Sequence, residues 1–128
     1  MASRRKGRIL AFQALYAWEI SGILPDDNLP EAVPDFTRLL LTGTVENIQA
    51  IDAMIKKHLE NWDFSRLNKV DLAILRMSTY SLMYQSETAP SIVIDEAISI
   101  SRDYGTDDSY RFINGVLDAI RKTILLDS

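Results

Sequence analysis

The sequence contains no cysteine and a single histidine, His58. Without cysteine the chain cannot form disulfides, zinc ribbons, cysteine-ligated iron–sulfur clusters or thiol nucleophiles. One histidine also excludes a metal site or catalytic pair built on two histidines, so we expect His58 to be exposed or to lie at a helix interface. The glycine-rich loops that cradle nucleotide phosphates, G-x-x-x-x-G-K-[ST] and G-x-G-x-x-G, are absent from the sequence too. The chain is therefore predicted to be non-enzymatic and to need no cofactor.

Long hydrophobic runs are also missing. No apolar stretch approaches the roughly 18 to 20 residues of a membrane-spanning helix, and the first residues lead into an amphipathic segment, unlike a signal peptide. We therefore expect a cytoplasmic protein without membrane contact. The composition is that of an ordinary soluble domain, 47% hydrophobic and 25% charged over 128 residues. It predicts one compact domain, 1–128.

Positive charge is unevenly distributed along the chain. Although the net charge is -4, residues 1–18 hold four of the 14 basic residues and none of the 18 acidic ones. The four cations are Arg4, Arg5, Lys6 and Arg8. A small basic patch on an acidic chain favours a local contact with a polyanion over general coating of nucleic acid. The alternative is a solvated N-terminal tail.

Apolar residues recur at helical spacing and no stretch alternates apolar with polar residues, so the fold is predicted to be all-α. The first helix is expected from Arg4 to Ser21. The face expected in its core carries Leu10, Ala11, Ala14, Ala17 and Trp18. The opposite stripe combines cations with aromatic residues and carries Arg5, Arg8, Phe12, Tyr16 and Glu19.

Proline, glycine and acidic residues predict a loop over 22–34, after which Asp35 is placed to cap the next helix. Apolar residues then continue at three- and four-residue steps to Leu59. This segment is expected to form one bent helix or two in tandem, with a break near Gly43 and Thr44.

A polar connector follows, in which Asp63 or Ser65 can cap a short turn. The next helix, over 70–85, is apolar almost all round and is therefore predicted to lie at the centre of the core. Two further helices are predicted over 90–103 and 108–124.

Two charged residues interrupt the apolar helix over 70–85. An unpaired buried guanidinium is very costly, so Arg76 must pair with a carboxylate, reach solvent or bind an anion, and the internal ion pair is the default. Asp71 lies one turn earlier on a different face, and we expect it at the surface or against a partner.

Phe112 and Gly115 in the last helix lie off the face made by Ile113, Val116 and Leu117. A glycine inside a helix costs about 1 kcal/mol relative to alanine, which indicates a close approach at Gly115 unless the residue is there by chance. Helix packing is one explanation for this pair. The other is a platform for an unpaired base, since a stacked base is worth about 1 to 3 kcal/mol.

Five segments follow one another along nearly the whole chain: Arg4-Arg5-Lys6-x-Arg8, Gln13-Ala-Leu-Tyr-x-Trp18, Val70-Asp-x-Ala-Ile-Leu-Arg76, Ile94-x-Glu-Ala97 and Tyr104-Gly-x-x-Asp-Ser-x-x-Phe-Ile-Asn-Gly-Val-Leu-Asp118. In order and spacing they resemble the NusB family of transcription antitermination factors. The resemblance implies an all-helical fold of about seven helices in two halves, an N-terminal half over 1–62 and a C-terminal half over 63–128.

The resemblance also implies a function. Proteins of this family bind the boxA segment of ribosomal RNA transcripts, together with the ribosomal protein that acts as NusE, in the transcription elongation complex. The residues that match the family's RNA-contacting positions are Arg4, Arg5, Lys6, Arg8, Tyr16, Arg76, Asp108 and Phe112. Lys6 stands where an arginine is usual. Asp71 matches the family's partner-binding surface.

We therefore predict an RNA-binding adaptor in which cations of the first helix contact phosphates while Tyr16 and Phe112 contact bases of a single strand, all within one shared cleft. A protein–protein helical adaptor or dimeric scaffold without direct RNA binding is the alternative. The same module occurs as an accessory domain of ribosomal RNA cytosine methyltransferases, whose catalytic domain does not fit in 128 residues. The sequence leaves open whether the chain forms a homodimer.

Overall fold

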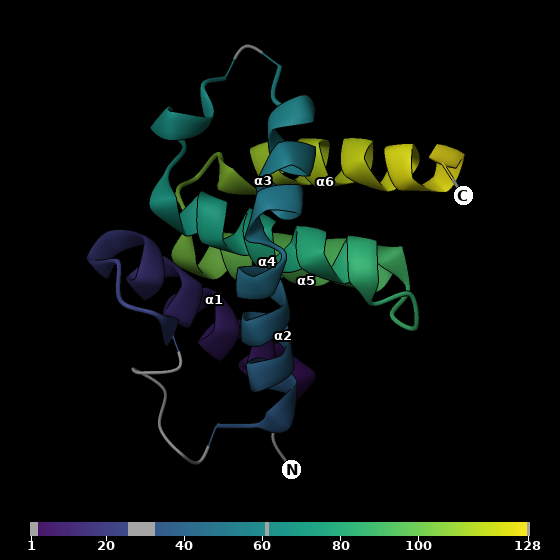
Figure 1. The fold of residues 1–128 in the computed structure, drawn as a ribbon. Coiled ribbons are helices and arrows are strands. Elements are labelled where there is room, and N and C mark those ends of the chain that lie inside the picture. The colour runs from purple at the N-terminus through teal and green to yellow at the C-terminus, as the bar shows by residue number, and fades with distance from the viewer. Residues whose placement is uncertain (1–2, 26–32, 61, 128) are drawn as a thin grey trace.

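The computed structural model describes residues 3–25, 33–60 and 62–127 and shows an all-helical fold, as predicted (Figure 1). Within these residues there are six α-helices and one short 3-10 helix, close to the expected seven. Their bounds are α1 Arg4–Ser21, α2 Asp35–Glu46, α3 Ile48–Lys57, η2 Phe64–Arg66, α4 Lys69–Tyr84, α5 Pro90–Tyr104 and α6 Ser109–Asp127. Residues 26–32 of the expected loop lie outside the described residues.

Local sequence signals set both ends of α1. The Ser3 hydroxyl accepts a hydrogen bond from the Lys6 N–H (3.1 Å), which is the usual N-terminal cap. Gly22 ends the helix with a φ of 75°, in the left-handed region that glycine enters without steric cost. The predicted bounds of this helix are confirmed.

The break between α2 and α3 falls at Asn47, and the expectation of a break near Gly43 and Thr44 was wrong. The helical backbone continues through Gly43. Tyr80 of α4 packs so closely against this glycine that a side chain would not fit there. The Asn47 side chain instead donates to the Gly43 carbonyl (2.8 Å) and competes with helix continuation. Asp35 is the first helical residue and makes no cap bond, so the expected capping role was also wrong.

Helix α4 lies at the middle of the molecule and is contacted by each of the other five α-helices (Figure 1). Every residue from Asp71 to Ser81 is buried. Asn68 caps its start by accepting from the Val70 N–H (2.8 Å). The prediction of a central core helix is confirmed, and buried residues from all six α-helices join one hydrophobic cluster around it.

The buried face of α1 is rotated from the predicted one. Phe12 is 3% exposed and Arg8 7%, although both were placed on the outward stripe, whereas Ala17 of the predicted core face is exposed. The reason is that α1 packs against α2 and the end of α5 as well as against α4: Arg8 lies over the Phe36 ring of α2, and the Phe12 ring packs on Tyr104 of α5. Helical periodicity identifies one apolar face and cannot anticipate a second neighbour.

Asp71 is buried (7% exposed), so the expectation of a surface position was wrong. The first turn of α4 is covered where the start of α6 approaches it, and Oδ1 accepts no hydrogen bond from the described residues. Burial raises the pKa of the Asp71 carboxyl, and the Ser109 hydroxyl, which favours the ionised form, only partly offsets this.

In the part of the chain that the structure describes, no helix is both long and apolar enough to span a bilayer.

Substitution by alanine is expected to change the stability of the fold in opposite directions at two glycines within helices. A Cβ on Gly43 would lie 2.2 Å from Cζ of the buried Tyr80, whereas a Cβ on Gly115 would meet nothing within 4 Å. We expect Gly43→Ala to lower the free energy of unfolding by about 1–3 kcal/mol through overpacking. Gly115→Ala should raise it by about 0.5–1 kcal/mol through helix propensity. Urea unfolding measures both, and equal effects of the two substitutions would contradict this account of the packing.

Asp71 predicts a pH-dependent stability. Because its native pKa lies above the unfolded value, the folded state holds the proton more tightly, and stability falls as pH rises from about 4 through the native pKa. Asp71→Asn cannot ionise, so its stability relative to the unsubstituted protein should improve over that rise. Urea unfolding from about pH 2.5 to 7.5 measures the difference.

Asp63→Asn provides the control of opposite sign. Hydrogen bonds from the Ser65 backbone and side chain lower the pKa of the exposed Asp63 carboxyl. The unsubstituted protein therefore gains stability relative to this variant as pH rises through the window below about 4. A stability difference for Asp71→Asn that does not change with pH would refute the raised pKa.

Candidate nucleic-acid interface

Cations at the start of α1 differ in exposure. Arg4 and Lys6 are exposed, and the Arg4 guanidinium lies 4.2 Å from the centre of the Phe36 ring in α2. The buried Arg8 guanidinium approaches the same ring at 5.3 Å. Burial lowers the pKa of Arg8, Glu96 acts to raise it and Arg4 lowers it further. Arg8 therefore joins α1 to α2, while Arg4 and Lys6 present their charge to solvent.

Arg5 is held by α5. Its Nη1 donates to the Ser99 hydroxyl at 2.6 Å, its Nη2 donates to Asp103 Oδ2 at 2.5 Å, and Glu96 Oε2 lies 3.5 Å from Nη1. The Arg5 side chain is 36% exposed. A phosphate that binds Arg5 must therefore compete with two carboxylates.

Aromatic residues continue along α1 from these cations. Tyr16 is 37% exposed, one turn beyond the buried Phe12. The Phe12 ring packs edge-on against Tyr104 at the end of α5, with ring centres 5.2 Å apart. Tyr16 is thus available to a ligand, while Phe12, its neighbour on the predicted stripe, is part of the fold.

Asp108 and Phe112 lie at the start of α6, one turn apart, with the Phe112 N–H donating to the Asp108 carbonyl. Asp108 is exposed. Phe112 is half-buried against the core, and its outer side contacts Trp62 with ring centres 5.4 Å apart. The surface beside Gly115, one turn further on, is open, so no packed helix explains that glycine.

Arg76 forms the internal ion pair that was its default prediction. Its Nε and Nη2 donate to the two carboxylate oxygens of Asp52, both at 2.9 Å, and its Nη1 donates to Glu19 at 3.1 Å. Burial acts to lower the pKa of the guanidinium, but the bonds and charge of Asp52 and then Glu19 outweigh it, so the pKa is raised. A hollow of about 260 Å³ at the end of α1 is lined by Trp18, Glu19, Gly22 and Arg76.

Of the predicted residues, Arg5 is linked to the start of α6 through the C-terminal end of α5. Arg5 contacts Asp103, and the guanidinium of the adjacent Arg102 lies 4.6 Å from the Tyr110 ring of α6. Contacts therefore run from the start of α1 over the end of α5 to the start of α6. Arg8 and Phe112 have different neighbours, in α2 and in the connector before α4, and Asp71 is buried.

Sequence reasoning missed Trp62 as a surface residue. Trp62 is 58% exposed, and its ring contacts the ring of Phe112. The available signal was a tryptophan in a polar connector, where no core face accounts for it.

His58 lies at a helix interface, as predicted. Its Nδ1 is 2.8 Å from the Met54 carbonyl and its Nε2 is 2.6 Å from the Thr123 hydroxyl, so it joins α3 to α6. Among the described residues no group of three or more His, Cys, Asp or Glu is arranged to hold a metal ion.

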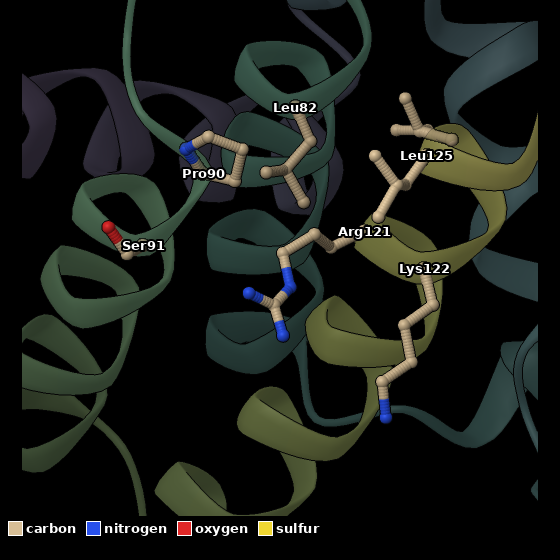
Figure 2. Close-up of a pocket in the computed structure, with 7 residues that line it drawn as sticks. Leu82, Pro90, Ser91, Arg121, Lys122 and Leu125 are labelled. Carbon is tan, nitrogen blue, oxygen red and sulfur yellow. The ribbon is translucent and has the colours of Figure 1, made fainter. Parts of the chain in front are cut away.

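A separate apolar hollow of about 560 Å³ lies between the end of α4, the start of α5 and the end of α6. Figure 2 shows Leu82, Pro90 and Leu125 around it, with the charged ends of Arg121 and Lys122 extending away from Leu125. None of the predicted RNA-contacting residues lines this hollow.

Comparison with known proteins places this geometry in a family. The NusB family model matches residues 5–122. The transcription antitermination protein NusB of Treponema pallidum (strain Nichols) is 53% identical over 131 residues, which cover 94% of this chain and 93% of its own length. The protein of the same name from Borreliella burgdorferi is 41% identical over 131 residues, covering 91% and 92% of the two chains.

Solved structures agree. NusB of T. maritima superposes with a TM-score of 0.85 at 36% identity, over 94% of this chain and 92% of that one. A NusB chain in a complex of antitermination factors NusB and NusE with double-stranded RNA superposes with a TM-score of 0.82 at 28% identity, over 94% and 96%. The chain therefore belongs to the NusB family of transcription antitermination proteins.

Proposed function

We propose that this protein is a cytoplasmic, non-catalytic adaptor that binds boxA-type RNA in ribosomal RNA transcripts together with the ribosomal protein that acts as NusE. The observation that carries the proposal is the row of contacts from Arg5 of α1 over the end of α5 to the half-buried Tyr110 at the start of α6, where Asp108 is exposed and Phe112 is half-buried. A solved relative that contains both NusE and RNA supports it. The assembly acts within the transcription elongation complex.

The surface separates two kinds of contact. Phosphates bind to Arg4 and Lys6, and to Arg5 in competition with Asp103 and Glu96. These contacts position the strand without reading its sequence. Tyr16 and Phe112 offer ring faces to unpaired bases, as single-stranded RNA requires. The exposed Asp108 carboxylate accepts a hydrogen bond from a base amino group. A carboxylate beside RNA then contributes to the selection of bases.

Three buried residues act less directly in this proposal. Arg8 holds α1 against α2, and Arg76 fixes α1 and α3 on α4 through Glu19 and Asp52. Asp71 offers a protein partner only the small exposed part of its side chain. Their substitution is therefore expected to disturb the arrangement of the surface as well as any direct contact.

Affinity for RNA is expected to depend on the two exposed cations of α1. The double variant Arg4→Gln/Lys6→Gln should bind a labelled single-stranded boxA RNA oligonucleotide more weakly, because it loses two phosphate contacts. The slope of log affinity against log salt should become shallower by about 1.4 units for two contacts with a single strand. Fluorescence anisotropy between 50 and 300 mM KCl, with and without NusE, measures it.

The control Arg121→Gln/Lys122→Gln removes the same charge at the C-terminal end of α6, far from the start of α1 (Figure 1). It should leave the slope unchanged. Equal slopes for both double variants would contradict the assigned surface. If the unsubstituted protein binds NusE but no RNA, single-stranded or duplex, the alternative of a protein–protein adaptor holds.

The second prediction concerns the carboxylate that competes for Arg5. Asp103→Asn removes the stronger contact of the Arg5 guanidinium. Since an exposed ion pair is worth up to about 1 kcal/mol, RNA affinity should rise by up to about fivefold. Glu87→Gln, an exposed acid in the turn between α4 and α5, should change affinity little. Weaker binding by Asp103→Asn would show that Asp103 positions Arg5 for RNA.

A further inference from the structure

We infer that Trp62, with Phe112, forms a stacking site for an unpaired RNA base, so that the RNA surface extends from α6 onto the connector before α4. This inference rests on the proposed RNA-binding function and adds a residue that neither the family resemblance nor the sequence periodicity assigns. Trp62 is the more exposed member of the pair, at 58%.

The geometry leaves the indole available. The two ring centres are 5.4 Å apart and the rings are tilted by 57°. Phe112 is anchored because it packs against the core cluster, so it supports one side of the indole while the rest remains exposed. Because Phe112 already holds the indole of Trp62 in place, a base can stack on the exposed face of the indole at little cost in side-chain entropy.

The surroundings of Trp62 are polar and include cations. Lys56, Lys57 and Arg66 are exposed on the segments that flank it, and the Lys56 ammonium lies 4.8 Å from the centre of the Phe64 ring. The nearby Asp63 carboxylate is engaged by the Ser65 backbone N–H at 3.0 Å. Aromatic residues interleaved with cations are typical of surfaces that bind single-stranded nucleic acid.

A protein partner would favour a different surface. Apolar docking sites bring several large hydrophobic side chains together, and such a group exists elsewhere, around the hollow in Figure 2, where Leu125 is 72% exposed and Leu126 follows it at 84%. The segments that flank Trp62 carry exposed cations and also the exposed acids Glu60 and Asp63, and its ring contact is with Phe112. An exposed indole with one aromatic contact in a charged setting matches a base better than an apolar protein face.

The position of the pair continues the proposed RNA path. Phe112 lies one turn from Asp108, and Arg111 between them is exposed, with its guanidinium 5.4 Å from the Tyr110 ring. Tyr110 and Phe112 lie two residues apart in α6 and point to different sides of the helix, so a strand that follows the contacts from Arg5 over the end of α5 to Tyr110 must cross the exposed Asp108 and Arg111 to reach the Phe112–Trp62 pair. The open surface at Gly115 leaves room beside it.

The test uses the two tryptophans of the chain, Trp18 and Trp62. In Trp18→Phe, Trp62 is the only tryptophan, and its fluorescence should be quenched when single-stranded boxA RNA is added. In Trp62→Phe, Trp18 reports instead, and quenching should be largely lost. NusE added alone should leave the fluorescence of Trp62 unchanged.

Affinity provides the second measurement. Trp62→Ala should weaken RNA binding about tenfold, as the loss of one stacked base does, while Trp62→Phe should retain most of the affinity. Because stacking neutralises no phosphate, Trp62→Ala should keep the salt slope of the unsubstituted protein. Circular dichroism and thermal unfolding check that the variants remain folded, and the Trp18→Phe titration decides the question if Trp62→Ala does not fold.

Each outcome separates this inference from the proposed function. If the unsubstituted protein binds RNA but Trp62 is not quenched and Trp62→Ala binds equally well, the stacking site is wrong and the RNA-binding function stands. If NusE alone quenches Trp62 and RNA does not, Trp62 contacts the protein partner and the inference is overturned. If RNA binds neither with nor without NusE, the proposed function fails first.

Discussion

Burial of α4 on every side is the constraint on which the rest of the structure depends. A helix covered all round has no face on which to place a polar side chain, so each of its charged residues needs a partner from a neighbouring helix. For Arg76 these partners are Asp52 of α3 and Glu19 of α1, which join the two helices to α4 through one guanidinium. The two parallel bonds to Asp52 use the fork geometry that distinguishes arginine from lysine. Asp71 has the uncharged Ser109 hydroxyl of α6 and no cation as partner, so burial outweighs that hydrogen bond and its pKa is raised.

The same demand for partners divides the basic N-terminal segment into structural and exposed cations. Arg5 is held by α5 and Arg8 by Phe36 of α2, so both fix the orientation of α1. Arg4 and Lys6 keep their charge in solvent. A basic run that looks uniform in sequence is thus divided by the fold, and fewer of its charges are available to a ligand than its formal charge indicates.

Helix positions could be predicted from the sequence because they depend on local signals. The first helix ends at Ser21 where the loop was predicted to begin, the helix predicted over 90–103 begins at Pro90, and the apolar helix 70–85 was correctly placed in the centre. Features that depend on packing between distant segments could not be predicted. Phe12 is buried because the end of α5 also packs against α1, and Asp71 because the start of α6 covers it. The helical backbone continues past Gly43, which fits beneath Tyr80, and the break falls at Asn47, whose side chain bonds back to the Gly43 carbonyl. Trp62 was missed for the same reason, since its contact with Phe112 joins residues fifty positions apart in the sequence.

An acidic chain with few free cations has a particular relation to RNA. With a net charge of -4, the chain can attract phosphates only at local groups of cations such as Arg4 and Lys6, so the proposed function implies weak non-specific binding to RNA. Affinity must then come from contacts that a generic polyanion cannot make, namely base stacking and hydrogen bonds to base edges. Such contacts are few on a surface of this size, and a second protein that supplies further contacts raises affinity without adding indiscriminate charge. The acidity of the chain is therefore consistent with the proposed joint action with a ribosomal protein, in which cations position the strand while the aromatic residues and the partner select it.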